Sequence, residues 1–168
     1  MRAEIFSSDF LISFFIFLST FIIIVAYYQN LQIDVSESNA RNKMYSTAIN
    51  IASLLSTTSG YPEYWDSNTV EVIGLYDSGK FNLTKFEELK EVSHANATKM
   101  LGSGFYRLNI SLKNVTGDII QKPNDPTFFY SYGTSFYDAE QIAVVKRLGI
   151  VKLNGNVTKV IMEVVLWA

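Results

Sequence analysis

The 168-residue sequence has no cysteine, one histidine and three prolines. Without cysteine there are no disulfides, thiolate nucleophiles or cysteine-ligated metals, so an exported domain would be held together by its core alone. The single histidine, His94, is too little for a zinc site, and we interpret it as a solvated loop residue. A net charge of −2 offers no basic surface for the phosphates of a nucleic acid.

The sequence also lacks the motifs of common catalytic and nucleotide-binding sites. It has no P-loop, dinucleotide-binding glycine pattern, nucleophile elbow or HExxH motif. Glu87, Glu88 and Glu91 are mixed with lysines, which is typical of the solvated face of a short helix rather than of an acid–base pair. Asp138 and Glu140 have the chemistry to bind a hard cation, but turn carboxylates are common. We therefore predict no enzyme activity, no catalytic residue, no metal site and no cofactor.

Charge is missing from one long stretch, between Asp9 and Asp34. Phe, Ile and Leu dominate the nineteen residues from Phe10 to Tyr28 within it. As a helix this segment would be roughly 28 Å long, close to the ~30 Å hydrocarbon core of a bilayer. Its two final tyrosines stand where aromatic side chains meet lipid headgroups. We predict a transmembrane or filament-core helix over 10–28, after a short leader and helix start over 1–9.

Two other interpretations of this segment are a buried helix of a soluble protein and a cleaved secretory signal. A charge-free run of this length is rare in soluble cores. A secretory signal has a shorter apolar region, ~7–15 residues, followed by small residues at the cleavage site. The sole candidate here, Ile24-Val25-Ala26, has a bulky residue where a small one is needed. The membrane interpretation is therefore favoured.

Five sequons follow the apolar segment, and by composition chance would give about two. The bias of basic residues on the two sides of the apolar segment is weak, so the sequons carry the orientation. They place the C-terminal part outside the cytoplasm and predict a single-pass glycoprotein of the cell membrane. Asn109 is the best acceptor by strand pattern, and Asn156 follows a hairpin tip. The predicted glycosylation sites are Asn82, Asn96, Asn109, Asn114 and Asn156.

The helix is predicted to continue outside the membrane over 29–58. Apolar residues recur there at helical spacing along one face, namely Ala40, Met44, Ala48, Ile51 and Leu55. The run Ser56 to Gly60 and then Pro62 end the helix, because proline cannot continue the hydrogen-bond ladder. The stripe predicts that this half of the helix packs on a domain.

Residues 59–168 predict an α+β head. A strand pattern over 105–113 has Tyr106, Leu108, Ile110 and Leu112 facing inward and Arg107, Asn109, Ser111 and Lys113 facing water. Asn154-Gly155 indicates a hairpin between two long strands, and Gly149 indicates a bulge. Together with the helix this predicts an antiparallel sheet packed on the second half of the long helix, with short helices added. The other expected elements are a strand over 70–75, helices over 82–92 (capped by Asn82 or Thr84) and 95–101, and strands over 141–153 and 157–167.

An aromatic segment, residues 128–137, holds six aromatic residues in ten. If buried, it is a core strand and its turn, which is the interpretation we favour. If exposed, it would suit a partner surface or a sugar ligand. Tyr61, Tyr64 and Trp65 are expected to cover the end of the long helix.

The short polar leader, the immediate apolar helix and the C-terminal sheet domain resemble type IV pilin-like proteins. The interior resembles archaeal members in Gly60-Tyr61-Pro62 with Trp65, in Val72-Ile73-Gly74-Leu75, in Asn82-Leu83-Thr84-Lys85, and in Tyr106-Arg107-Leu108. The resemblance implies a leader of the class III signal-peptide type, which a prepilin-type peptidase cuts between Ala3 and Glu4. The family usually has glycine before the cut and an acidic residue fifth in the mature chain, whereas here alanine precedes it and Asp9 is sixth.

These observations predict a pilin-like structural subunit, of the minor kind, in a type IV pilus-like surface filament or a related assembly. Its partners would be the membrane, the peptidase and other pilin-like subunits through the N-terminal helix, with Asp9 serving assembly. The head could also meet a surface or sugar ligand. The alternative is a membrane-tethered binding or sensory module that never assembles. A pilin needs leader processing and helix association, and a tethered module needs neither.

Overall fold

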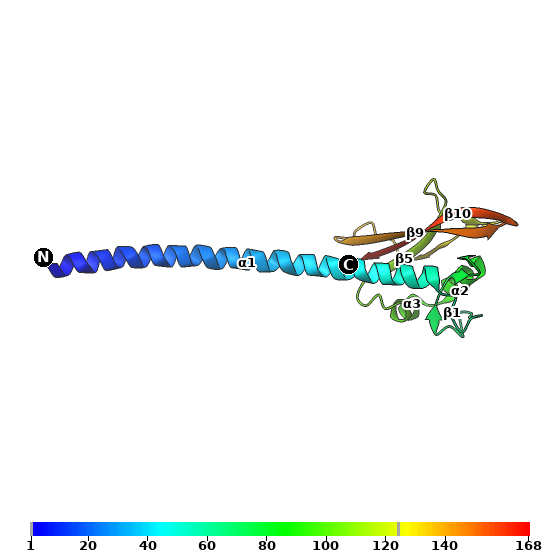
Figure 1. Ribbon diagram of the computed structural model, residues 1–168, viewed down its shortest axis with the longest axis horizontal. Helices are drawn as coiled ribbons and strands as arrows, with labels where there is room; N and C mark the ends of the chain where they lie inside the picture. The colour runs from blue at the N-terminus through cyan, green and yellow to red at the C-terminus, as the bar shows by residue number, and fades with distance from the viewer. Residues whose placement is uncertain (1, 124) are drawn as a thin grey trace. The chain divides into compact units, whose positions relative to one another are not determined.

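The computed structural model describes residues 2–123 and 125–168, and the side chains of residues 2–7 and 34 lie outside that description (Figure 1). The chain forms two compact units, one ending at Ala40 and one spanning Arg41–Ala168. We call the second unit the head. Helix α1 (Arg2–Thr57) belongs to both units. The predicted α+β class with a long N-terminal helix and antiparallel sheets is confirmed.

Within the head, α1 contributes one buried stripe. Met44, Ala48, Ile51 and Leu55 are buried as predicted, and Ala52 joins them. Ala40, which was predicted to begin the stripe, is exposed, because it lies before the head begins. The helix ends at Thr57 and the chain then turns at the positive φ of Gly60, close to the predicted end.

The end of α1 is covered by one of the three aromatic residues expected there. Trp65 is buried, and its Nε1 donates to the carbonyls of Ser59 at 2.9 Å and Gly74 at 3.2 Å. Tyr61 and Tyr64 were predicted to pack as well, but both are exposed. The indole of Trp65 therefore covers the end of α1 alone, and the two tyrosines lie at the surface.

The main sheet has four antiparallel strands in the order β8 (Ser131–Gly133), β5 (Arg107–Lys113), β10 (Asn156–Trp167) and β9 (Ile142–Leu153). The predicted hairpin between β9 and β10 is confirmed, with positive φ at both Asn154 and Gly155. The predicted bulge at Gly149 is wrong, since it pairs with Val160 in regular register. Glycine is needed there because a Cβ would lie 2.2 Å from the ring of Phe81.

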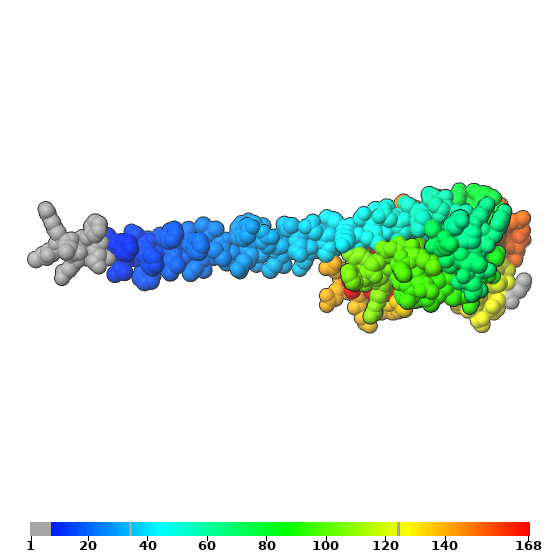
Figure 2. All heavy atoms as spheres, turned by 90° about the horizontal axis from the view of Figure 1, so that it is seen from below, coloured from blue at the N-terminus to red at the C-terminus, as the bar shows by residue number. Residues whose placement is uncertain are grey.

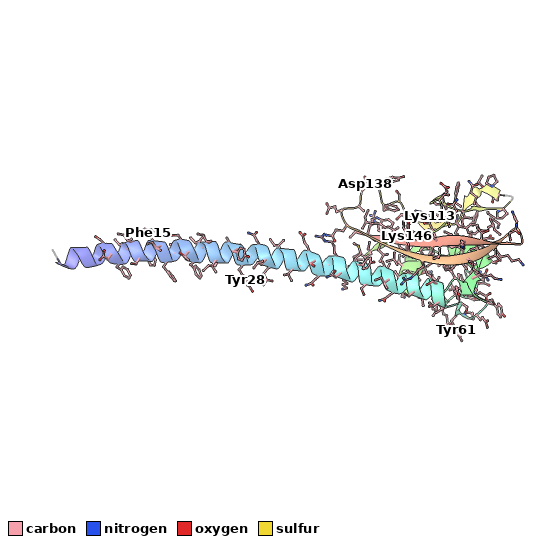
Figure 3. All side chains as sticks on the ribbon, turned by 45° about the horizontal axis from the view of Figure 1, so that its top comes forward. Phe15, Tyr28, Tyr61, Lys113, Asp138 and Lys146 are labelled. Carbon is pink, nitrogen blue, oxygen red and sulfur yellow. The ribbon has the colours of Figure 1, made fainter. Side chains whose placement is uncertain are left out.

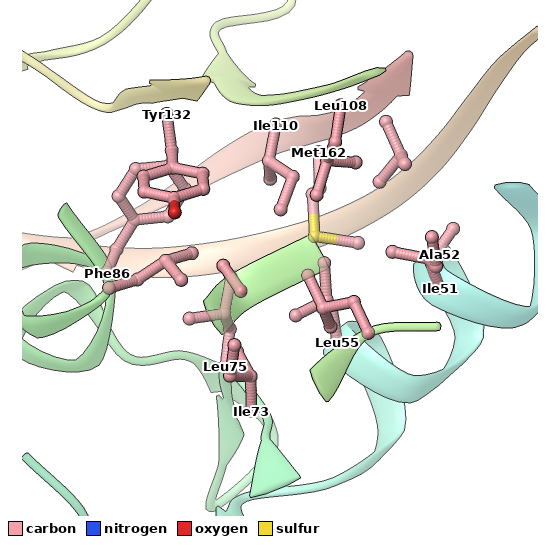
Figure 4. Packing of buried hydrophobic residues seen from close by; sticks show 14 of the residues in the cluster. Ile51, Ala52, Leu55, Ile73, Leu75, Phe86, Leu108, Ile110, Tyr132 and Met162 are labelled. Atoms are coloured by element: carbon pink, nitrogen blue, oxygen red, sulfur yellow. The ribbon is translucent and has the colours of Figure 1, made fainter. Parts of the chain in front are cut away.

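The inner face of the sheet and the α1 stripe share one core (Figure 4). Leu108, Ile110 and Leu112 point into it as predicted, although Tyr106 is only half-buried. The outer face was predicted to be wet, yet Ser111 on β5 is buried there with Glu163 and Trp167 of β10. The connection from β8 to β9 covers this face, because β8 and β9 are opposite edges of the sheet.

Helix α3 and strand β1 lie on the side of α1 away from the main sheet, and the remaining short elements are spread around the head (Figure 1). The predicted helices are found, and the Asn82 side chain caps the first by accepting from the Thr84 and Lys85 amides at 3.0 and 3.3 Å. The predicted strand over 70–75 is reduced to two residues. The bounds are β1 (Gly60–Tyr61), β2 (Val72–Ile73), β3 (Tyr76–Asp77), β4 (Lys80–Phe81), α2 (Leu83–Glu91), α3 (His94–Met100), β6 (Gln121–Lys122) and β7 (Asp125–Phe129).

The α1 stripe should be the main stabilising contact of the head. In a soluble fragment covering 34–168, we expect Leu55→Ala to lower the free energy of unfolding by about 2–5 kcal/mol, because it empties a fully buried site. The exposed control Asn50→Ala should change it by less than about 0.5 kcal/mol. Chemical denaturation followed by circular dichroism measures both. A fragment that aggregates as wild type would show that the apolar segment belongs to the core.

Candidate functional site: an apolar helix segment and the surface of the head

The N-terminal part of α1 exposes an apolar surface all round. Every described side chain over residues 8–33 is exposed, and most are Phe, Ile or Leu (Figure 2). Phenylalanines one turn apart stack along the helix, with ring centroids 6.3 Å apart for Phe10 and Phe14. Among the described residues, α1 is the one helix that is long and apolar enough to cross a membrane.

Two polar side chains inside this segment, Ser19 and Thr20, are satisfied by the helix itself. The Ser19 hydroxyl donates to the Phe15 carbonyl, and the Thr20 hydroxyl donates to the Ile16 carbonyl at 2.9 Å. Each hydroxyl thereby bonds one turn back along the same helix. These groups consequently do not need water, so the segment can lie in an apolar environment.

Asp9 lies at the N-terminal edge of the apolar segment. Its side chain is exposed and directly precedes Phe10 in α1. The predicted leader cut falls between Ala3 and Glu4, whose side chains lie outside the described residues. The structure therefore places the carboxylate beside the apolar surface and leaves the cleavage prediction open.

Glu163 is the central charged residue on the outer face of the sheet. Its side chain is 8% exposed, and it forms ion pairs with Lys113 of β5 and, at 3.2 Å, with Lys146 of β9. Burial alone would raise the pKa of Glu163, but the hydrogen bonds and charges of the two lysines outweigh it and hold the pKa below its usual value. One carboxylate thus links three strands. Its two lysine partners, Lys113 and Lys146, are labelled in Figure 3.

Sequence reasoning missed this cluster. A single acidic residue inside the apolar run of β10 was the available signal, because a carboxylate in a buried strand needs a positive partner. Its partners could not be named without the strand register, since Lys113 and Lys146 come from two other strands.

The glutamates of α2 make structural contacts. Glu87 accepts a hydrogen bond from the Tyr130 hydroxyl at 2.9 Å and pairs with Lys122 at 2.6 Å. Burial and the Glu87 carboxylate raise the pKa of Tyr130 above its usual value. Glu88 accepts from the Ser67 amide at 3.1 Å. The two Glu87 contacts join α2 to the chain between residues 122 and 130, and the Glu88 contact holds the loop that follows α1.

Lys85 is another buried charge that the sequence did not reveal. Its Nζ donates to the carbonyls of Ser59 at 2.6 Å and Glu63 at 2.7 Å. Burial lowers the pKa of Lys85, and the nearby carboxylates of Asp77 and Glu63 oppose that shift. The lysine therefore holds the segment that follows α1 in place.

The aromatic segment divides between core and surface. Tyr130 and Tyr132 are buried, as favoured, and burial raises the pKa of Tyr132 to about 12. Phe136 packs edge-on against Trp167 on the outer face, with centroids 5.9 Å apart, and Tyr137 is 95% exposed. The segment is therefore core at Tyr130 and Tyr132 and surface at Tyr137.

An open cleft of about 590 Å³ adjoins these exposed aromatics. Phe105 and Tyr137 line it, both almost fully exposed, and Arg107 adds a cation. Asp138 (labelled in Figure 3) and Glu140, considered earlier as cation ligands, also line the cleft and are exposed. Flat apolar rings beside charged hydrogen-bonding groups are suited to a ligand with both apolar and polar faces.

His94 differs from its predicted role as a solvated loop residue. It begins α3, it is half-buried, and its ring lies 6.0 Å from that of Tyr132. Its Nδ1 is buried and has no hydrogen-bond partner within the described residues. The prediction was wrong because the short helix starts earlier than its pattern suggested.

The five sequons differ in how accessible their amides are. Asn96 on α3 and Asn156 at the start of β10 are exposed. The Nδ2 of Asn109, predicted to be the best acceptor, instead donates to the Thr134 carbonyl at 3.1 Å, and the residue is half-buried. Asn82 caps α2, and Asn114 is bonded within its own turn, to Asp118 at 3.2 Å. The geometry therefore favours Asn96 and Asn156.

Comparison of the chain with protein-family models, curated proteins and solved structures finds no match. Any functional assignment consequently rests on the chain's own residues and on the geometry described above.

The Glu163 cluster should make stability depend on pH. Because its folded-state pKa lies below the usual 4.5, its contribution is present above that pH and is lost as the pH falls through the folded-state value. In the 34–168 fragment, Glu163→Gln should destabilise by about 1–2 kcal/mol near neutral pH. The difference from wild type should shrink below about pH 4. Exposed Glu140→Gln should show no difference at any pH, and a pH-independent loss for Glu163→Gln would contradict the assignment.

Glycosylation should follow amide accessibility. In protein purified from membranes of a host that N-glycosylates, we expect sugar at Asn96 and Asn156, because both are exposed. Glycopeptide mass spectrometry locates the sugar, and Asn96→Gln or Asn156→Gln should each remove one glycan. The control Asn109→Gln should leave the glycan mass unchanged. Sugar on Asn109 with Asn96 and Asn156 bare would contradict the ranking.

Proposed function

We propose that this chain is a pilin-like structural subunit, of the minor kind, in a type IV pilus-like surface filament or a related assembly. The observation that supports this proposal best is that the two parts of α1 have different surroundings. Its segment 10–28 is apolar and exposed all round, whereas its residues between Met44 and Leu55 form the buried stripe of the head. One continuous helix thus joins a folded head to a segment that requires an apolar partner.

The character of segment 10–28 supports such a partner. Burial of apolar surface is worth about 25 cal/mol per Å², so leaving this segment in water would be very costly. A helix that is apolar all round has no solvent face and must be surrounded on every side. Lipid can surround it in a single-pass membrane protein, and other helices can surround it in a filament core.

Asp9 supports assembly over permanent residence in lipid. At the edge of the segment its carboxylate can stay hydrated while the chain is in the membrane. In a dry helix bundle it would need a positive partner or a proton. A cut after Ala3 would create that partner, the new α-amino group of Glu4 on a neighbouring subunit, although Glu4 itself would compete for the charge.

The sequons support a head outside the cytoplasm, where glycosylation takes place. A prepilin-type peptidase would process the leader at the membrane. The resulting subunit would be a glycoprotein with its helix in the bilayer before assembly and its head at the cell surface.

A membrane-tethered binding module is the second candidate function, and the cleft beside Trp167 favours it. Phe105 and Tyr137 expose their rings there next to Arg107, an arrangement suited to a sugar or another surface ligand. Such a module would use the same anchor and would need neither leader removal nor helix association.

Variants at Asp9 and Ala3 test the choice between them. We expect Asp9→Ala to leave membrane insertion intact and to lower incorporation into sheared surface filaments, because the carboxylate loses its role between helices. The matched control Asp9→Glu keeps the charge and should assemble. Ala3→Leu should block leader removal and abolish incorporation. Immunoblots of cell-bound and sheared fractions, with N-terminal sequencing, measure these effects.

The tethered-module function would replace the filament function in either of two cases. One is wild-type protein that never appears in sheared material. The other is that Asp9→Ala and Ala3→Leu both behave as wild type.

A further inference from the structure

The outer face of the β9–β10 hairpin carries an apolar stripe framed by lysines. Leu148 is 75% exposed and Val157 is 69% exposed, although both stand where a solvated antiparallel sheet usually carries polar residues. We call this surface the basic face. Its members, all on one side of the hairpin by register, are Val144, Lys146, Leu148, Ile150, Lys152, Val157 and Lys159.

The basic face also forms one edge of the sheet. β9 is the edge strand and is twelve residues long. Long edge strands usually carry protection, because their unpaired backbone groups invite other chains to pair. The sole acidic residue of the two strands is Glu163, which is buried and paired with lysines. Exposed charge on this surface is therefore positive throughout.

A second surface has the opposite composition. From residue 59 to residue 79 the chain carries four carboxylates and no lysine or arginine. Tyr64 is 87% exposed within this segment, and Tyr61 is exposed beside it. We call this surface the acidic face. Its exposed members are Tyr61, Glu63, Tyr64, Asp66, Glu71 and Val72.

The two faces lie on opposite sides of the head. Tyr61 is on the side of α1 away from the sheet, whereas Lys146 is on the sheet (Figure 3). The same arrangement of β1 and β9 is seen in Figure 1. Each face thus combines exposed apolar groups with charge of one sign. Because the faces lie on opposite sides of the head, they do not contact each other within one chain.

We infer that the acidic face of a second copy of this chain docks on the basic face of the first. Exposed tyrosines would cover the aliphatic stripe, and carboxylates would meet the surrounding lysines. Pairing of two β9 edges with each other is disfavoured, because it would set lysines against lysines. A contact between two different faces repeats from subunit to subunit, and it generates an open chain where the rotation between subunits does not close into a ring. The inference rests on the proposed function, since it supplies head contacts for the same assembly.

Introduced cysteines give a direct test, because the chain has none of its own. The full-length variants Leu148→Cys, Tyr64→Cys and the double variant are produced in separate cells, and intact cells are treated with a short bis-maleimide. We expect the double variant to give a ladder of dimers, trimers and larger species on a denaturing gel. The two single variants should remain monomeric alone and give dimers when produced together.

Charge reversal tests the electrostatic part. In the double-cysteine background, Lys152→Glu with Lys159→Glu should reduce the ladder about five- to tenfold, because attraction becomes repulsion at two positions. Adding Glu63→Lys and Glu71→Lys should restore it. The control Lys43→Glu reverses an exposed lysine on α1, which belongs to neither face, and should have no effect.

Two results would overturn the inference. One is self-linking of Leu148→Cys alone, which would mean an edge-to-edge pair. The other is the absence of a ladder in the double variant while the chain is found in sheared filaments, which would refute this head contact and leave the proposed function standing. Conversely, a ladder without sheared filaments would uphold the contact and refute the filament.

Discussion

The structure depends on one contact, the packing of the α1 stripe against the inner face of the sheet. Ala48 and Ala52 have no exposed surface and belong to the core shared with the sheet. Ile51 and Leu55 then fill the space beneath Met162 and the β5 residues (Figure 4). Because the sheet comes late in the sequence, the head can close only by bringing its last strands back onto its first helix. The part of α1 before Arg41 takes no part in this core, and its described side chains are exposed.

Because α1 packs on the inner face of the sheet, the chain connection that crosses the sheet runs over its outer face. The β8–β9 connection must pass from one edge of the sheet to the other, and its Phe136 packs on Trp167 on the way. It covers only part of the face, so the Glu163 cluster lies at the boundary between covered and open surface. Lys113 is partly sheltered and Lys146 is mostly exposed, although both pair with the same carboxylate. The uncovered remainder is the β9 edge, where Leu148 and Val157 are exposed.

Strong periodic patterns and turn chemistry predicted the elements well. The 3.6-residue stripe gave the buried side of α1, and Asn154-Gly155 gave the hairpin. The wrong predictions lie where distant segments meet. The ring of Phe81 leaves no room for a side chain at position 149, and the Asn109 amide donates to the Thr134 carbonyl. Among the site residues, Asp9 and the sequons are predictions from local sequence, and they remain predictions. The Glu163 cluster and the two charged faces could not be predicted in this way, because strand register and three-dimensional placement decide which charges become neighbours.

The division of α1 also explains why the head would need contacts of its own in an assembly. A surface made of Phe, Ile and Leu packs favourably in many registers, because dispersion and burial are non-directional. Such helices can associate strongly and still leave the spacing between subunits undefined. In the proposed assembly Asp9 would add one polar constraint at one end of the segment, which would select an axial position but leave rotation about the helix open. Oppositely charged faces on a rigid head are directional, so they can define the orientation that the apolar helix leaves free.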